Sequence, residues 1–564
     1  MAGSQEPLGA LEEEYWNACL ADRPLEATIL GYREFDDRLP DVTPEGRRRW
    51  DMQLESFVSR AEAMRGKPMG REEALNLELL LGAGRRQLEY SLCRLGEWEV
   101  DPLQGPQVDF MNAESYQPVR TAAEGRAMVK RWKGMGKFLD DQKSNLERSA
   151  SSGRVAVRAC VEKVIDEVQD LVARPDSEWP LLRPLSVKHA DWSDSERDEF
   201  TRGLAEAVSA SVRPAFERYL ESLKSEILPR ARPQERPGVM HVPGGPEAYA
   251  RLIRVHTSLD LSAEQIHQIG LDSVARVNAE MQVLGDKVLG TRDKKEILRK
   301  LRTDRSFYFD DSDEVEAKAE SSLAKAKAAI PRWFGRLPKT DCKVVVMGEH
   351  EAKHSTIAYY RQPAADGSRP GSYYINTTSP ETRPRYEAEA LAYHESIPGH
   401  HLQIAIAQEL QGMPDFRRHN SVTAFIEGWG LYSERLADEM GLYSSDLDRI
   451  GMLSYDSWRA CRLVVDTGMH AKGWTRAQAI DFMMKNTALA ENNIVNEVDR
   501  YITWPGQALA YKMGQLEILR LRYSARERMG KKFDVMRFHD VLLGSGPVPL
   551  GVLGKLVEDM AGGA

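Results

Sequence analysis

Apolar residues recur at intervals of three and four positions through most of the 564-residue chain, with Lys, Arg and Glu between them. This spacing places the apolar side chains on one face of an α-helix. It is clearest in residues 10–21, 72–92, 155–173 and 200–227. The pattern predicts a mainly α-helical protein, built as a large helical bundle.

A proline-rich segment, LPRARPQERPGVMHVPGGPEAY, interrupts this pattern between residues 228 and 249. Proline lacks the backbone N–H that a helix interior needs, and glycine favours turns, so such a segment separates helical regions. We therefore predict an amino-terminal helical lobe over residues 1–235 and a second lobe over residues 236–564.

Three short segments in the second lobe differ from the helical pattern: CKVVVMGE, STIAYYRQ and GSYYINTT. They are rich in β-branched and aromatic residues and are separated by turn-forming residues such as PAADGSRPG, which is typical of strands. We expect a small antiparallel β-sheet at about residues 342–377. Helical spacing returns near Arg385, so the sheet should lie beside the helices that follow.

The composition is that of a globular protein, with 42% hydrophobic and 29% charged residues. The net charge is −9, and basic residues are interleaved with acidic ones, which argues against a nucleic-acid partner. The five cysteines form no C-x-x-C pair, so neither a disulfide framework nor a thiolate zinc site is indicated. The sequence shows no signal-peptide pattern and no apolar stretch of about 18 residues that could span a bilayer. These features predict a soluble, cytoplasmic protein with no membrane partner; they leave its oligomeric state open.

The stretch HESIPGHHLQ, residues 394–403, begins like the zinc-peptidase motif H-E-x-x-H, but Pro398 stands where the second histidine belongs. On a regular helix, His394 and His400 would lie about 240° apart around the axis and roughly 9 Å apart along it, so they could not share an ion. Pro398 disrupts a regular helix and Gly399 tolerates unusual backbone angles. A bulge over residues 396–399 would return His400 to the side of His394.

Two interpretations of this stretch remain open. In one, the helix ends at Ile397 and the histidines are ordinary polar residues. In the other, His394 and His400 bind a metal, with Glu395 as the base that acts on water and His401 in a supporting position. The metal interpretation is favoured because three of the 12 histidines fall within eight residues, next to a glutamate.

A third ligand is expected, since catalytic zinc usually has three protein ligands and one open position. Glu427, in TAFIEGWGLYSERLADEM, follows His400 by enough residues for a second helix to return antiparallel to the first. Its neighbours are apolar, and a buried carboxylate needs a partner such as a metal. Glu434 lies seven residues later on nearly the same helix face and is a candidate to hydrogen-bond a ligand histidine.

Two later blocks hold candidates for stabilising negative charge during catalysis. His470 could donate to an oxyanion and Asp466, four residues earlier on the same helix face, could orient it. Tyr511 is a second candidate donor, near the start of a helix. The alternatives also stay open: a surface ion pair for Asp466 and His470, and a core position for Tyr511.

A peptide substrate could pair with an edge strand of the sheet, and GSYYINTT is the predicted strand nearest in sequence to the metal motif. Arg459 and Arg462 are candidates for ion pairs or for a substrate carboxylate. The residues proposed to contact substrate are Tyr374, Asn376, Arg383, Arg385, Tyr501, Gln507 and Lys512.

Four blocks together, HESIPGHHLQ, EGWGLYSE, RACRLVVDTGMH and PGQALAYKMG, resemble those of a bacterial domain-of-unknown-function family, number eight-eight-five. The resemblance covers at least the last 320 residues. That family in turn is similar to helical zinc peptidases of the neurolysin, angiotensin-converting enzyme and thermostable carboxypeptidase type. The resemblance implies one zinc ion, a correspondence of Gly399-His400 with their Gly-His, and Glu427 as their glutamate ligand.

The sequence thus predicts a zinc-dependent hydrolase of peptide or related amide bonds, with His394, His400 and Glu427 as ligands and Glu395 as general base. Two other functions remain open. One is a metal-dependent enzyme of a specialised biosynthetic pathway that acts on a nonpeptide small molecule. The other is a noncatalytic binding protein with a degenerate site.

Overall fold

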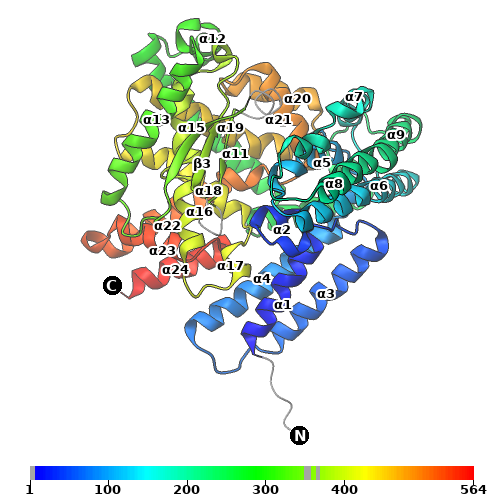
Figure 1. Ribbon diagram of the computed structural model, residues 1–564. Coiled ribbons are helices and arrows are strands. Elements are labelled where there is room, and N and C mark those ends of the chain that lie inside the picture. Colours follow the sequence, from blue (N-terminus) through cyan, green and yellow to red (C-terminus); the bar gives the residue numbers. More distant parts are fainter. Residues whose placement is uncertain (1–6, 349–356, 364–368, 564) are drawn as a thin grey trace. The chain divides into compact units, whose positions relative to one another are not determined.

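The computed structural model describes residues 7–348, 357–363 and 369–563, which form a mainly α-helical protein with one small sheet, as predicted (Figure 1). The chain divides into two compact units, Met1–Ala248 and Tyr249–Ala564. The boundary that we predicted after residue 235 lies in the irregular segment that precedes this division. Helix α10 (Gly245–Thr257) contains the division itself.

The first unit is helical throughout, and its core is formed by large side chains such as Phe110, Trp132, Trp179 and Phe216. Helix α6 starts with a capping box, in which Thr121 and Glu124 satisfy each other's backbone N–H groups. The helices are α1 (Leu8–Asp22), α2 (Pro24–Leu30), α3 (Pro44–Glu62), α4 (Arg71–Cys93), α5 (Pro106–Tyr116), α6 (Ala122–Ser151), α7 (Arg158–Ala173), α8 (Asp194–Glu206) and α9 (Arg213–Ser222).

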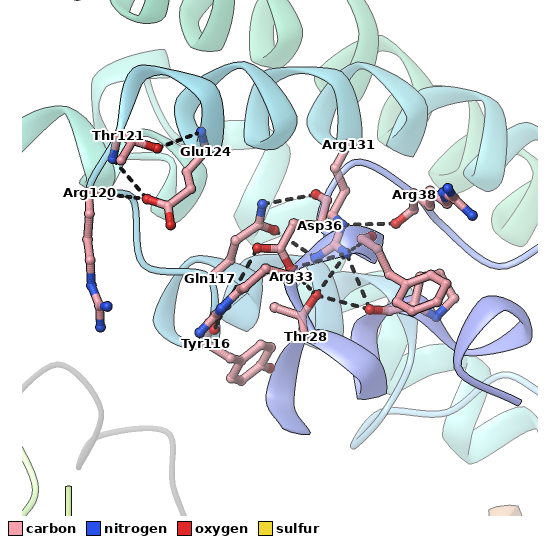
Figure 2. A network of polar contacts seen from close by, with 12 residues as sticks. Thr28, Arg33, Asp36, Arg38, Tyr116, Gln117, Arg120, Thr121, Glu124 and Arg131 are labelled. Carbon is pink, nitrogen blue, oxygen red and sulfur yellow. Dashed lines mark hydrogen bonds and ion pairs between the residues drawn. The ribbon is translucent and has the colours of Figure 1, made fainter. Parts of the chain in front are cut away.

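Arg131 of α6 connects the first unit's amino-terminal segment to its core (Figure 2). Its guanidinium donates to the backbone oxygen of Arg38 at 2.9 Å, to the side-chain oxygen of Gln117 at 2.7 Å and to the hydroxyl of Thr28 at 2.9 Å. It also donates to the carbonyl of Phe35. Burial lowers the pKa of Arg131 to about 10, yet the group stays charged at neutral pH. The buried guanidinium of Arg131 is thus a shared hydrogen-bond donor for all of these acceptors.

Replacing Arg131 with Met should destabilise the first unit by about 3 kcal/mol or more, because several buried acceptors lose their donor at once. Urea unfolding would measure the loss, and hydrogen exchange in α6 would assign it to this unit. Arg126→Met, on an exposed position of the same helix, is the matched control and should change little. Equal stability of the two variants would contradict a central role for Arg131.

The second unit is also mainly helical and is organised around α19, which is buried along most of its length and packs against α11. Its other helices surround α19 and the sheet (Figure 1). Besides α10, the helices are α11 (Ala263–Leu289), α12 (Lys294–Thr303), α13 (Ser312–Ala329), α15 (Ala388–Glu395), α16 (His400–Glu409), α17 (Asp415–Arg418), α18 (Thr423–Glu439), α19 (Asp446–Ala471), α20 (Arg476–Asn486), α21 (Glu491–Thr503), α22 (Leu509–Met529), α23 (Val535–Gly544) and α24 (Leu550–Gly562).

The sheet contains β1 (Cys342–Val346), β2 (Ala358–Arg361) and β3 (Gly371–Ile375) in the order β1-β3-β2. We expected an antiparallel sheet, but β3 pairs in parallel with β1 and antiparallel only with β2. The connection from β1 to β3 is long enough for the chain to return in the same direction. Because β3 lies in the centre, it is not the edge strand that we expected to be open to a substrate.

Two glycines allow α18 and α22 to cross in direct backbone contact. A Cβ atom on Gly428 would lie 2.5 Å from the Cα of Gly514, and a Cβ on Gly514 would collide with the carbonyl oxygen of Ala424. Because Glu427 precedes Gly428 and Tyr511 lies about one turn before Gly514, this close crossing also brings Glu427 and Tyr511 toward each other. Only glycine at both positions permits it.

Gly514→Ala should therefore destabilise the second unit by about 2 kcal/mol or more, since the added methyl group meets backbone that cannot move out of its way. Thermal unfolding would measure the change. Gly544→Ala in α23 is the control, because nothing lies within 4 Å of a Cβ at that position. If Gly514→Ala were as stable as Gly544→Ala, the two helices would not be in the contact described.

Two further sequence expectations concern membranes and cysteines. Among the described residues, no helix combines the length and hydrophobicity needed to cross a bilayer. All five cysteines are buried free thiols.

Candidate metal centre

The segment HESIPGHH forms two helices separated by a short turn. Helix α15 ends at Glu395 and α16 begins at His400, while residues 396–399 are not helical. The Ile397–Pro398 peptide bond is cis. A Cβ on Gly399 would collide with the backbone oxygens of Tyr393 and His394, so the turn can fold back onto the end of α15 only with glycine there.

Helix α18 holds this turn in place. The indole N–H of Trp429 donates to the carbonyl of Pro398 at 2.9 Å, and the hydroxyl of Ser433 donates to the same oxygen at 3.2 Å. Sequence reasoning treated Trp429 only as an apolar neighbour and missed Ser433. Their spacing of four residues, which places both on one face of α18, was the available signal.

The structure brings the side chains of His394, His400 and Glu427 together. One ligand atom from each lies within 4.8 Å of the others. The Oε2 atom of Glu427 is 3.7 Å from Nε2 of His394 and 3.6 Å from Nε2 of His400. The two imidazole rings are nearly perpendicular, with centroids 4.7 Å apart. The turn therefore returns His400 to the side of His394, although the two histidines are too far apart on a regular helix.

Glu434 supports this cluster from behind. Its Oε1 atom lies 2.8 Å from Nδ1 of His394, which leaves Nε2 directed to Glu427. The Nη2 atom of Arg459 is 4.0 Å from the same Glu434 oxygen. Burial favours the neutral ring of His394, but hydrogen bonds to Glu427 and Glu434 outweigh it and raise the pKa to about 9. Burial acts against the charge of Glu427 as well, but its bonds to both histidines hold its pKa well below the usual range.

The donor set suits zinc. Two imidazole nitrogens and one carboxylate oxygen are ligands that catalytic zinc commonly takes, and ligand atoms around tetrahedral zinc lie about 3.3 Å apart. The distances of 3.6 and 3.7 Å to Glu427 are slightly wider than this. Two buried or half-buried carboxylates, Glu427 and Glu434, face the histidines, so the site favours positive charge.

His401 points to the sheet and is not one of the three clustered residues. Its Nε2 donates to the carbonyl of Thr340 at 3.1 Å, and its Nδ1 accepts from the hydroxyl of Tyr360 at the same distance. Burial lowers the pKa of His401 to about 4, so the ring is neutral. Gly371 makes room for it, because a Cβ there would collide with the imidazole. His401 thus joins α16 to the sheet.

Two of the predicted catalytic residues lie at the metal cluster. Glu395 directly follows His394 and is half-buried, and its charge adds to burial in raising the pKa of Tyr373 on β3. Tyr511 is half-buried, with the guanidinium of Arg462 4.3 Å from its ring centroid. Burial raises the pKa of Tyr511, and the charge of Glu427 raises it further.

His470 and Asp466 have other contacts. Nε2 of the fully buried His470 donates to the carbonyl of Tyr501 at 2.9 Å. Asp466 accepts from the hydroxyl of Tyr249 and, at 3.2 Å, from the backbone N–H of Gly506. Burial raises the pKa of Asp466 to about 7. These bonds join α19 to α10, α21 and the turn before α22.

The proposed substrate-binding residues fall into three places. Asn376 and Arg383 line a pocket beside β3, while Tyr374 stacks on Tyr359 with ring centroids 4.9 Å apart. Arg385 pairs with Asp310 and Glu314 at 2.6 and 2.8 Å. Around α19, Tyr501 accepts from Arg462, Gln507 accepts from Arg500, and Lys512 pairs with Asp456. The structure thus does not bring this set together at one site.

Comparison with known proteins places the chain in a family. A family model described as a bacterial protein of unknown function (DUF885) matches residues 24–557. The chain belongs to this family. The match extends the resemblance seen in four sequence blocks to both structural units, and no curated protein matches the chain.

Two solved structures resemble this DUF885 member along nearly its whole length. The first is described as a "putative lipoprotein" from Colwellia psychrerythraea, with 28% identity, a TM-score of 0.91 and 99% of each chain covered. The second is described as a "putative lipoprotein" of unknown function from Shewanella oneidensis, with 18% identity, a TM-score of 0.74 and coverage of 98% of this chain and 100% of that one; it shows the fold alone.

The description of the first structure overturns the predicted cytoplasmic location. A lipoprotein is held at a membrane by covalently attached lipid, so a soluble-looking sequence is compatible with membrane attachment. Buried thiols do not require a reducing compartment either, because cysteines that lie apart from one another stay unpaired. The amino-acid composition therefore does not distinguish a cytoplasmic protein from one attached to a membrane by lipid.

Proposed function

We propose that this DUF885 member is a zinc-dependent hydrolase of peptide or related amide bonds. The observation that carries the proposal is the convergence of His394, His400 and Glu427, with the half-buried Glu395 next to His394 in the chain. Glu434 on Nδ1 of His394 adds the outer hydrogen bond that metal-binding histidines usually make. The resemblance to helical zinc peptidases supports an amide bond as the target.

Zinc held by these three side chains would supply a Lewis acid that lowers the pKa of water toward 7 and polarises the substrate carbonyl. Glu395 would take a proton from the attacking water as the new C–O bond forms. It would pass that proton to the leaving nitrogen as the C–N bond breaks, which yields an amine and a carboxylic acid that then loses its remaining proton to water. Tyr511 would donate a hydrogen bond to the carbonyl oxygen as negative charge develops there.

The similarity to a protein described as a lipoprotein favours attachment to a membrane surface. Substrates would then be met outside the cytoplasm. Fractionation of cells that produce the full-length protein tests the location separately from the chemistry.

The metal is tested on protein purified without a His tag. Elemental analysis should find about one zinc per chain, and an anomalous scattering map at the zinc edge should place the ion among His394, His400 and Glu427. A panel of peptides and N-acyl amino acids should identify a hydrolysed amide. Absence of any metal would favour a noncatalytic binding protein, and zinc without amide hydrolysis would favour the small-molecule enzyme.

A further inference from the structure

A pocket lies along α15 next to the proposed base. Ala388 and Leu391 of α15 line it, and Leu391 is four residues before Glu395. Residues four apart share a helix face and lie about 6 Å apart along the axis. The pocket therefore opens on the same side of the helix as Glu395, about one turn away.

The opposite wall comes from β3. Tyr373 and Ile375 line the pocket, and because they are two residues apart they point to the same face of the sheet. Burial raises the pKa of Tyr373, and the charge of Glu395 raises it further. The pocket is thus lined by both α15 and β3.

Helices α13 and α19 complete the pocket, and both pack against α15. Val315 and Ala319 come from α13, and Tyr455 comes from α19. Phe309 and Ile357 also contribute, and Ile357 is 36% exposed. The lining is thus mostly aliphatic and aromatic, with one apolar side chain partly open to solvent.

The polar residues of the pocket already have partners. Asn376 accepts from the backbone and the hydroxyl of Thr378, and Arg383 donates to the carbonyl of Thr378 at 2.9 Å. Glu387 accepts from Ser454 at 2.7 Å, and burial raises its pKa to about 7. These polar groups form hydrogen bonds within the protein, so the rest of the pocket surface is apolar. Such a surface suits an uncharged apolar group better than a charged one.

We propose that this pocket binds the side chain of a residue adjacent to the scissile amide, so that the substrates carry a bulky aliphatic or aromatic residue there. The proposal rests on the proposed amide hydrolase function. It names the substrate class: peptides or N-acyl amino acids with Leu- or Phe-like side chains at the cleaved bond. The pocket, one turn from Glu395, is placed to receive that side chain while the amide lies at the base.

The test uses the zinc-loaded full chain and N-acetyl dipeptides in which one residue beside the bond is Gly, Leu or Phe and the other is Gly. Wild-type protein should prefer Leu or Phe over Gly by about 10- to 200-fold in kcat/KM in one of the two series. Ala319→Leu fills the pocket and should reduce this preference by about 10-fold or more. Ala317→Leu, exposed on the same helix, should leave both activity and preference unchanged.

Val315→Ala widens the same pocket and keeps the proposal testable if Ala319→Leu does not fold. It should raise the preference for Phe over Leu by several-fold. A wild-type preference near one in both series, or an unchanged preference in a folded pocket variant, would overturn the proposal while leaving amide hydrolysis intact.

A binding measurement separates this proposal from the proposed function. Calorimetry should show tighter binding of N-acetylphenylalanine than of N-acetylglycine to wild-type protein, and Ala319→Leu should remove the difference. This outcome is expected even if no dipeptide is hydrolysed, in which case only the catalytic proposal fails. Equal binding of the two ligands by wild-type protein would refute the pocket assignment.

Discussion

Replacing His400 with alanine should abolish stoichiometric zinc binding, whereas replacing His401 should leave zinc bound. The two residues are adjacent and both buried, so the loss of packing is similar in the two variants. Only His400 places a nitrogen near Glu427, at 3.6 Å, while His401 uses its two nitrogens on Thr340 and Tyr360. Without His400, a histidine and a carboxylate remain, and two ligands do not hold zinc tightly.

The measurement is zinc content per folded chain, together with turnover on the amide identified in the substrate panel. His401→Ala should retain about one zinc and lose at most about 10- to 100-fold in activity, because it acts through the sheet and not on the ion. Zinc loss in His401→Ala with retention in His400→Ala would mean that the turn at residues 396–399 presents the other histidine. Retention in both variants would exclude this motif as the metal centre.

Glu395→Gln should lower turnover by about 100-fold or more and leave the zinc content unchanged. Glutamine has nearly the same size as glutamate but accepts no proton at neutral pH, so the change removes the base and none of the three ligands. Steady-state kinetics and elemental analysis of the same preparation would show the two results together.

The control for this variant is Glu320→Gln, which removes the same charge from an exposed position on α13. It should have normal turnover and normal zinc content. Near-normal turnover of Glu395→Gln would reject Glu395 as the base. Loss of zinc from Glu395→Gln would instead show that Glu395 contributes to the binding of the ion.

Some of this site follows from local sequence. Helical spacing in α18 places Glu427 and Glu434 on one face of the helix and Trp429 and Ser433 together on another. Pro398 and Gly399 signal an interrupted helix without any knowledge of the fold. The predicted interruption of four residues corresponds to the gap between Glu395 and His400.

Other features depended on contacts between distant segments. Lys512 and Arg385 were candidate substrate contacts, but they pair with Asp456 and with Asp310 and Glu314. His470 was a candidate donor, but its ring is buried against the carbonyl of Tyr501. Neither set of partners is close in sequence, so no local pattern indicates it.

The sheet likewise has features that the local sequence predicts and features that depend on contacts between distant segments. Enrichment in β-branched and aromatic residues, between turn-forming segments, predicted the three strands, because such residues favour extended chain. The order β1-β3-β2 and the parallel pairing depend on how the long connection between β1 and β3 folds, which this enrichment does not encode.

By itself, the sequence determined the helical fold class and the presence of a small sheet, because both follow from local spacing and residue type. Its motifs determined the membership of the DUF885 family and the set of residues able to bind a metal. Only the tertiary structure decided that His400 and not His401 meets Glu427, that Glu434 supports His394, and that an apolar pocket lies one turn from Glu395. The physical reason is that these relations depend on the contact of α18 with the turn at Pro398, on the packing of α13 against α15, and on the position of β3 at the pocket that they line.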